Sequence, residues 1–174
     1  MDLLIVSDSH GRTEALAEVL RRQRRRPDLL LFLGDGLRDL QIPELYGLPL
    51  RAVCGNCDLF LRSLPEEFRD EECFCLEGYR ILMTHGHPYQ VKGGLGPLLR
   101  RAAEVDADAV LFGHTHFPLE QTFPAGTRVG AGELTRPLTL FNPGSLREGS
   151  FGTLHLDAGA PLFAHGSLHR DPRE

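Results

Sequence analysis

Short apolar runs alternate with polar, glycine-containing turns along most of this 174-residue chain. Five of the runs have the length and composition of buried strands, so we expect strands at residues 3–6, 29–33, 50–54, 79–84 and 109–112. Between the first two runs, apolar residues recur at helical spacing after Thr13, which we interpret as the N-cap of a helix. A strand, a helix and a second strand in this order predict parallel pairing with a right-handed crossover.

Residues 71–76 and 79–83 flank Glu77 and Gly78, which is typical of a hairpin, and a helical stripe follows Gly93 and Gly94. After the strand expected at 109–112 the pattern changes to strands and turns, with strands expected at 138–141 and 151–156. The first half thus predicts parallel pairing and the second half antiparallel pairing. We therefore predict an α/β fold in which two packed mixed β-sheets are flanked by helices, as a single domain over residues 1–174.

Composition and charge narrow the classes of function. The chain is 41% hydrophobic with a formal net charge of −5, which is ordinary for a globular domain and argues against a nucleic-acid partner. The arginine-rich run at residues 21–26 lies at the end of the expected helix, where cations complement the helix dipole. No apolar stretch is long enough to span a bilayer, so no membrane partner is expected. Residues 1–6 lack the basic region of a secretory signal, and we expect a cytoplasmic protein.

Each expected buried strand is followed by residues that commonly bind metals or phosphate. The five motifs are Asp8-Ser9-His10, Gly34-Asp35, Gly55-Asn56-Cys57-Asp58, His85-Gly86-His87 and Gly113-His114-Thr115-His116. In open α/β sheets, ligands bind at the carboxyl ends of the strands, so one shared site is predicted. The candidate metal ligands are Asp8, His10, Asp35, Asn56, His85, His114 and His116. Seven ligands are too many for one tetrahedral zinc but enough for two ions that share a carboxylate.

The ligand types also bear on the metal and on the reaction. Imidazole suits zinc, iron or nickel, whereas carboxylate and amide oxygen suit harder ions such as manganese. We expect two divalent ions, with manganese first and nickel, iron or zinc as alternatives. Two neighbouring ions would hold a phosphoryl group and activate a water for attack at phosphorus.

The cysteines offer an alternative metal site. Cys54, Cys57, Cys73 and Cys75 could together form a four-thiolate zinc site. We favour another interpretation, because Cys54 ends an apolar strand, and Cys73 and Cys75 alternate with Phe74 at strand periodicity. Cysteines in such positions are usually small, buried hydrophobic side chains.

The five motifs in this order, followed by Asn142-Pro143-Gly144-Ser145, resemble the calcineurin-like metallophosphoesterase superfamily, and in particular its small bacterial and archaeal phosphodiesterase branch. The resemblance extends from residue 3 to about residue 156. It implies an αββα sandwich with a dinuclear site at the sheet ends. It also implies that Asp8, His10 and His116 hold one ion, that Asn56, His85 and His114 hold the other, and that Asp35 bridges the two. Relatives often self-associate, so a homo-oligomer is an expectation as well.

One position departs from the wider family. Many members carry histidine, the usual proton donor to the leaving group, where this chain has Cys57. A thiol with an ordinary pKa near 8.5 is a poorer acid, although the small branch also tends to carry cysteine here. We expect Asn56, Cys57 and His87 to contact the substrate and to be catalytic together with Asp35. His87, two residues after His85, is the alternative proton donor.

These observations predict a metal-dependent phosphodiesterase that acts on small phosphodiesters. A phosphomonoesterase and a nuclease use the same chemistry and remain alternatives. The acidic charge and the lack of an evident DNA-binding segment argue against the nuclease. A non-catalytic scaffold is the alternative from another class, because the retromer scaffold subunit resembles this branch. The presence of all seven ligand residues favours an enzyme over a scaffold.

Overall fold

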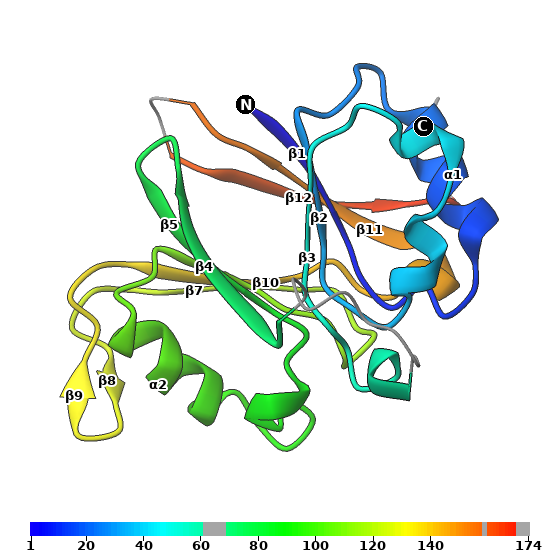
Figure 1. Ribbon diagram of the computed structural model, residues 1–174. Helices are drawn as coiled ribbons and strands as arrows, with labels where there is room; N and C mark the ends of the chain where they lie inside the picture. Colours follow the sequence, from blue (N-terminus) through cyan, green and yellow to red (C-terminus); the bar gives the residue numbers. More distant parts are fainter. Residues whose placement is uncertain (61–68, 158–159, 170–174) are drawn as a thin grey trace.

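The computed structural model describes residues 1–60, 69–157 and 160–169. Two five-stranded mixed sheets pack face to face in it (Figure 1). The first sheet has the order β12-β11-β1-β2-β3, formed by Leu162–Ser167, Ser150–His155, Asp2–Val6, Leu29–Phe32 and Leu50–Ala52. The second has the order β4-β5-β6-β10-β7, formed by Glu71–Leu76, Tyr79–Thr84, Ala109–Leu111, Leu138–Asn142 and Leu119–Phe123. The strands β8 (Arg128–Val129) and β9 (Gly132–Glu133) form a separate two-stranded sheet.

Parallel pairing places the carboxyl ends of neighbouring strands at the same edge of a sheet. Strands β1, β2 and β3 are parallel, as the strand–helix–strand pattern predicted. In the second sheet, β5 and β6 are parallel too. The division into a parallel first half and an antiparallel second half holds only in part. The pairs β7–β10 and β11–β12 are antiparallel as expected, but β10 pairs parallel to β6 and the hairpin β4–β5 is antiparallel. Both sheets are therefore mixed, and strands from the two halves of the chain share each of them.

The core lies in three layers of contacts. Along β1, Leu3 and Ile5 pack between the two sheets, whereas Leu4 and Val6 face the opposite side and pack with helix α1 (Thr13–Arg22). Helix α2 (Gly96–Glu104) covers the outer face of the second sheet. The arrangement is helix, sheet, sheet and helix, which confirms the predicted αββα sandwich (Figure 1). Strands buried on both faces explain why their sequences are continuous apolar runs.

Helix α1 begins differently from the prediction. Arg12, not Thr13, occupies the N-cap position, and Thr13 is the first helical residue. The Thr13 hydroxyl instead donates a hydrogen bond to Asp39 Oδ1 over 2.8 Å. At the other end, Arg21 and Arg22 lie in the last turn as expected and pair with Glu18, so these arginines belong to an ordinary solvated helix end.

The cysteines follow the prediction only in part. Cys54 is buried, but Cys73 and Cys75 are exposed. Phe74 and Leu76 are residues of β4 that pack against the core, and strand alternation therefore turns the thiols of Cys73 and Cys75 outward. Within the described part of the chain, the clusters of metal-type side chains include none of Cys54, Cys73 and Cys75. The four-thiolate alternative thus finds no support.

Short 3-10 helices form the connections around the strand ends. They are η1 (Leu37–Leu40), η2 (Pro43–Leu45), η3 (Asp58–Phe60), η4 (His87–Tyr89) and η5 (Leu146–Glu148). The segment at 39–48 thus contains the end of η1 and all of η2. The tail after residue 157, for which the sequence made no prediction, supplies the edge strand β12 beside β11. Among the described residues, no helix is long and apolar enough to cross a membrane.

Candidate metal centre

The predicted ligands all follow the carboxyl ends of β1, β2, β3, β5 and β6. Backbone conformation there is unusual: the non-glycine ligand residues with a positive φ are Asp8, His10, Asp35, His114 and His116, with angles between 45° and 67°. Such conformations each cost about 1–3 kcal/mol and persist where the surroundings fix them, typically at functional sites. The tight turns that they create bring side chains from both sheets together.

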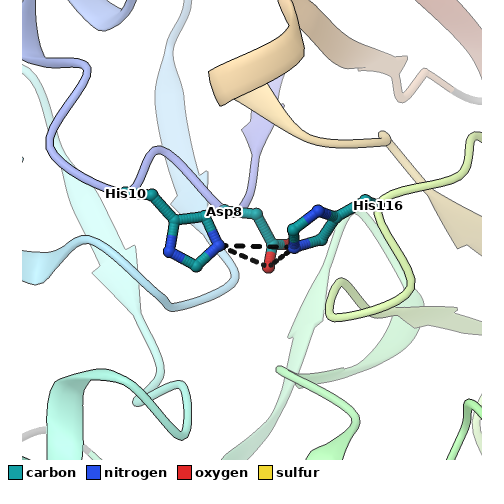
Figure 2. A group of neighbouring side chains, drawn as sticks. All are labelled: Asp8, His10 and His116. Carbon is teal, nitrogen blue, oxygen red and sulfur yellow. Dashed lines mark hydrogen bonds and ion pairs between the residues drawn. The ribbon is translucent and has the colours of Figure 1, made fainter.

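Asp8, His10 and His116 form the first cluster, with one ligand atom from each within 4.8 Å of the others. Asp8 Oδ1 lies 3.6 Å from His10 Nε2 and 3.1 Å from His116 Nε2, and the two imidazole nitrogens are 3.3 Å apart (Figure 2). Asp8 and His10 come from the loop after β1, and His116 comes from the loop after β6. The cluster therefore joins the two sheets.

Asp35, His85 and His114 form the second cluster. His85 Nε2 lies 3.4 Å from Asp35 Oδ2 and 3.2 Å from His114 Nδ1. Asp35 follows β2 in the first sheet, whereas both histidines follow strands of the second sheet. This cluster also spans the two sheets.

Asp35 lies between the two clusters. The same oxygen, Oδ2, is 3.4 Å from His85 Nε2 in one cluster and 3.8 Å from His10 Nε2 in the other. Asp8 Oδ1 is similarly 3.8 Å from His85 Nε2. Six of the seven predicted ligands thus form one continuous group, with the two carboxylates at its centre.

Each central carboxylate has one oxygen fixed by the protein and one directed into the group. Asp8 Oδ2 accepts hydrogen bonds from the Ser7 hydroxyl (2.6 Å) and the His114 N–H (3.0 Å), while buried Asp8 Oδ1 accepts none. Asp35 Oδ1 accepts a hydrogen bond from the Cys57 N–H over 2.7 Å, which leaves Oδ2 toward the histidines. A buried acceptor without a donor is costly unless a cation satisfies it.

His85 is oriented by the backbone. Its Nδ1 lies 2.7 Å from the Leu33 carbonyl oxygen, so this nitrogen carries the proton and donates, and Nε2 faces Asp35. Metal-bound histidines are commonly oriented in this way. Burial would lower the pKa of His85, but the hydrogen bond to Asp35 and the charges of Asp8 and Asp35 outweigh it and raise the pKa. Without a metal, the two carboxylates therefore favour the protonated form of His85.

The pKa values of Asp35 and His114, the two ligands beside His85, are both lowered. Burial would raise the pKa of Asp35, but the hydrogen bond and the charge of His85 outweigh it and hold the pKa well below the usual carboxyl range. Burial, followed by the charges of His85 and Lys92, lowers the pKa of His114 to about 4. Asp35 is thus ionised and His114 neutral at neutral pH, which are the protonation states that metal ligands need.

Asn56 and Cys57 lie at the open side of the group. Asn56 Oδ1 is buried and accepts no hydrogen bond, while its Nδ2 donates to Cys57 Sγ over 3.4 Å. The Cys57 thiol is exposed and forms a third cluster with His10 and Asp35, which the sequence did not predict. Burial of the sulfur, followed by the hydrogen bond and the charge of Asp35, raises the pKa of Cys57 to about 11. The thiol is therefore protonated at neutral pH.

His87 lies beside the second cluster. Its ring centroid is 5.5 Å from that of His85 and 6.2 Å from that of His114. Burial and the charge of His85 lower the pKa of His87, so its imidazole is neutral at neutral pH. Its Nδ1 is buried without a hydrogen-bond partner, which leaves this nitrogen for a ligand or a water.

Two supporting residues were not identified from the sequence. Asp58 is buried and accepts four backbone N–H groups, from Asp35, Gly36, Leu37 and Gly55. Asn142, the first residue of the Asn-Pro-Gly-Ser motif, donates from Nδ2 to the Gly113 carbonyl (2.9 Å) and to Thr115 Oγ1 (3.1 Å), on either side of His114 in the sequence. Only the position of Asp58 within the Gly-Asn-Cys-Asp motif pointed to it, because three of its four partners are more than twenty residues away.

The donor set fits divalent metal ions. It combines carboxylate oxygens with imidazole nitrogens, and two of its members, Asp8 Oδ1 and Asn56 Oδ1, are buried acceptors without donors. Oxygen and imidazole ligands together suit manganese, iron, nickel or zinc.

Comparison with known proteins agrees with this chemistry. The family model of the calcineurin-like phosphoesterase superfamily domain matches residues 1–158. A probable metallophosphoesterase of Bacillus subtilis, YsnB, is 36% identical over 147 residues, which are 84% of this chain and 76% of that protein. A solved structure of a predicted phosphoesterase from Streptococcus pneumoniae has a TM-score of 0.70 at 25% identity, with 95% of this chain and 88% of that chain covered. The structure of an archaeal phosphodiesterase, 19% identical with a TM-score of 0.60 over 95% of this chain and 99% of that chain, shares the fold.

Proposed function

Since this chain belongs to the calcineurin-like phosphoesterase superfamily, a family of metal-dependent phosphoesterases, we propose that it is a phosphodiesterase acting on small phosphodiesters. The observation that carries the proposal is the position of Asp35, whose Oδ2 lies within 4 Å of a histidine from each of the two ligand clusters. A carboxylate in this position is suited to two ions rather than one. Two neighbouring ions are a recurrent solution for displacement at phosphorus.

We assign the ligands as the two clusters suggest. Asp8, His10 and His116 would hold one ion, and His85, His114 and Asn56 the other, with Asp35 shared. Manganese is the proposed metal, because oxygen donors from Asp8, Asp35 and Asn56 accompany the imidazoles. When bound, the ions would supply positive charge to the phosphoryl oxygens and make a water more acidic.

The residues of the chain supply orientation and a proton. The Leu33 carbonyl and the Ser7 hydroxyl fix the ligand atoms of His85 and Asp8, so little reorganisation is needed when an anionic substrate binds. Cys57 holds a proton at neutral pH beside Asp35, whereas His87 is neutral. The thiol is thus the protonated candidate for donation to the leaving group. Its high pKa makes it a weak acid, which suits substrates whose leaving groups need little protonation.

The preference for a diester follows from the same features. The motif with Cys57 resembles the small phosphodiesterase branch, and a named phosphodiesterase shares the fold. A diester with a stable leaving alcohol or phenol can react without a strong general acid. We therefore propose small, activated phosphodiesters as the substrate class.

The test compares a bis-aryl phosphodiester with the corresponding aryl phosphomonoester. Metal-stripped protein is assayed after addition of manganese, nickel, iron, zinc or magnesium. The test variants are Asp35→Asn and His85→Ala, and Glu120→Gln on β7 is the control, because Glu120 is exposed. We expect metal-dependent diester hydrolysis that both test variants lose and the control keeps.

Other outcomes redirect the proposal. Faster hydrolysis of the monoester would make the protein a phosphatase with the same site. A folded, metal-loaded protein that hydrolyses neither ester would contradict the enzyme and favour a binding module.

A further inference from the structure

Lys92 is the only lysine in a chain that has 19 lysine and arginine residues. The other eighteen basic residues are arginines, so Lys92 carries the one side-chain ammonium group of the chain. It lies in the loop between η4 and α2, five residues after His87.

The loop is fixed against the metal centre by the residue before Lys92. Val91 is only 5% exposed, and its N–H donates to the Gly86 carbonyl over 3.5 Å. A Cβ atom on Gly86 would lie 2.9 Å from Val91 Cγ2, so Val91 packs directly on the backbone of Gly86, between His85 and His87. The Gly93 N–H donates to the Gln90 carbonyl over 2.8 Å and closes the turn. Lys92 thus extends from a fixed point beside two histidines of the site.

The ammonium group is free to bind an anion. Lys92 is exposed, and within the described ranges no carboxylate pairs with it. Charges near a protein surface influence each other over about 10 Å at ordinary salt. An unpaired cation on the loop that packs against Gly86, between His85 and His87, would attract an anionic substrate into the site.

We propose that Lys92 is a substrate-binding residue whose ammonium group contacts the phosphate of the phosphodiester on the side of the metal centre formed by His85 and His87. Lysine binds phosphate as a point charge on a flexible stem, so it can follow the phosphate during the reaction. The inference rests on the proposed function for the identity of the substrate. The contact itself requires only a phosphate anion.

The kinetic test replaces the charge. Lys92→Gln is expected to raise KM for the aryl diester by about tenfold, the size of a lost charge-assisted contact, with kcat within about twofold. Lys92→Arg should restore most of the affinity. Arg128→Gln, which removes an exposed positive charge from the β8–β9 hairpin, should leave KM unchanged. Metal content is measured for each variant, and equal content excludes an indirect effect through the ligands.

A second measurement does not depend on turnover. Because Lys92 is the only side-chain amine, acylation by an amine reagent can be followed at this residue by peptide mass, with the Met1 amine as the internal reference. Inorganic phosphate is expected to slow acylation of Lys92 relative to Met1, and chloride at equal ionic strength should not. The comparison is made on metal-loaded and metal-free protein.

The two measurements separate the inference from the proposed function. An unchanged KM in Lys92→Gln, or the absence of protection by phosphate, would overturn the role of Lys92 even if the wild type hydrolyses diesters. Protection by phosphate in a protein that hydrolyses no ester would support an anion site at Lys92 and contradict the phosphodiesterase.

Discussion

The carboxylate of Asp58 accepts a hydrogen bond from the backbone N–H of Asp35, with 2.7 Å between Oδ2 and N. Asp58 Oδ2 also accepts from the Gly55 N–H, and Oδ1 accepts from the N–H groups of Gly36 and Leu37. One buried side chain thus ties the loop that carries Asp35 to the loop that carries Asn56 and Cys57. The position of the central carboxylate depends on this link between the ends of β2 and β3.

Replacement of Asp58 by asparagine should disturb both stability and metal binding. The new NH2 group would face two N–H donors wherever the amide is placed, because each carboxylate oxygen accepts two. We expect a loss of roughly 2–4 kcal/mol in the free energy of unfolding. Metal affinity should fall about 10–100-fold, as for other residues that orient metal ligands. Urea denaturation and metal titration measure the two effects.

Glu120→Gln is the matched control for Asp58→Asn, because it also neutralises a carboxylate but on an exposed position of β7. Wild-type metal affinity in Asp58→Asn would show that the loop keeps its position without this side chain.

Gly55 provides an independent test of the same junction. A Cβ atom at this position would lie 2.0 Å from Asp35 Oδ1 and 2.4 Å from Asp35 N, far inside van der Waals contact. Gly55→Ala should therefore displace Asp35 and abolish high-affinity metal binding, with a loss of about 1–3 kcal/mol in stability. Isothermal titration with manganese and thermal unfolding would measure both.

Gly132→Ala in β9 is a suitable comparison for Gly55→Ala, since the nearest atom to its Cβ would be 3.9 Å away. If Gly55→Ala bound metal as the wild type does, the close contact between the two loops would not be required for the site.

The sequence was sufficient to predict this convergence because the physical cause is simple. Parallel strands β1, β2 and β3 end at the same edge of one sheet, and β5 and β6 do so in the other. Polar residues directly after these strands must therefore be near each other. Each motif could be recognised locally, since the apolar run and its terminating polar residues are adjacent in the chain.

The features that the sequence did not predict depend on distant partners. Asp58 resembles an ordinary turn residue until its acceptor role toward amides around residue 35 is seen. The exposure of Cys73 and Cys75 depends on which face of β4 meets the core, and Phe74 decides this. Periodicity shows that two residues share a face but not whether that face is buried. Strand β12 depends on pairing with β11 rather than on its own apolar pattern.

The identity of residue 57 should determine how the rate depends on the leaving group. The pKa of the Cys57 thiol is raised to about 11, first by burial and then by Asp35, whereas an imidazole ordinarily titrates near 6.5. Cys57→His should therefore accelerate hydrolysis of diesters with poor leaving groups by about tenfold or more, and change activated diesters little. The measurement is kcat/KM for a series of aryl diesters with leaving phenols of increasing pKa.

Cys73→His serves as the control for Cys57→His, because Cys73 is an exposed cysteine on β4 outside the ligand clusters. A Cys57→His variant with the same dependence on the leaving group as the wild type would exclude residue 57 as the proton donor.

The acid stability of the protein should depend on a three-residue group that joins β4, η4 and α2. Glu71 accepts hydrogen bonds from the Tyr89 hydroxyl and from Arg101, whose Nη2 lies 2.6 Å from Glu71 Oε1. Burial would raise the pKa of Glu71, but Arg101 and Tyr89 outweigh it and lower the pKa below the usual value. Burial and Glu71 raise the pKa of Tyr89 to about 12, so its hydroxyl stays protonated through pH 9.

A carboxyl whose pKa is lower in the folded state than in the unfolded state stabilises the fold above its unfolded pKa, near 4.5, and this contribution disappears as the pH falls through the folded pKa. Glu71→Gln should accordingly reduce the free energy of unfolding by about 1 kcal/mol between pH 5 and 9, as expected for a partly exposed pair. The difference from the wild type should shrink as the pH falls below 4.5. Urea denaturation across this range measures it, with Glu120→Gln as the control, and a difference that persists unchanged at pH 3 would mean that the charge of Glu71 is not its source.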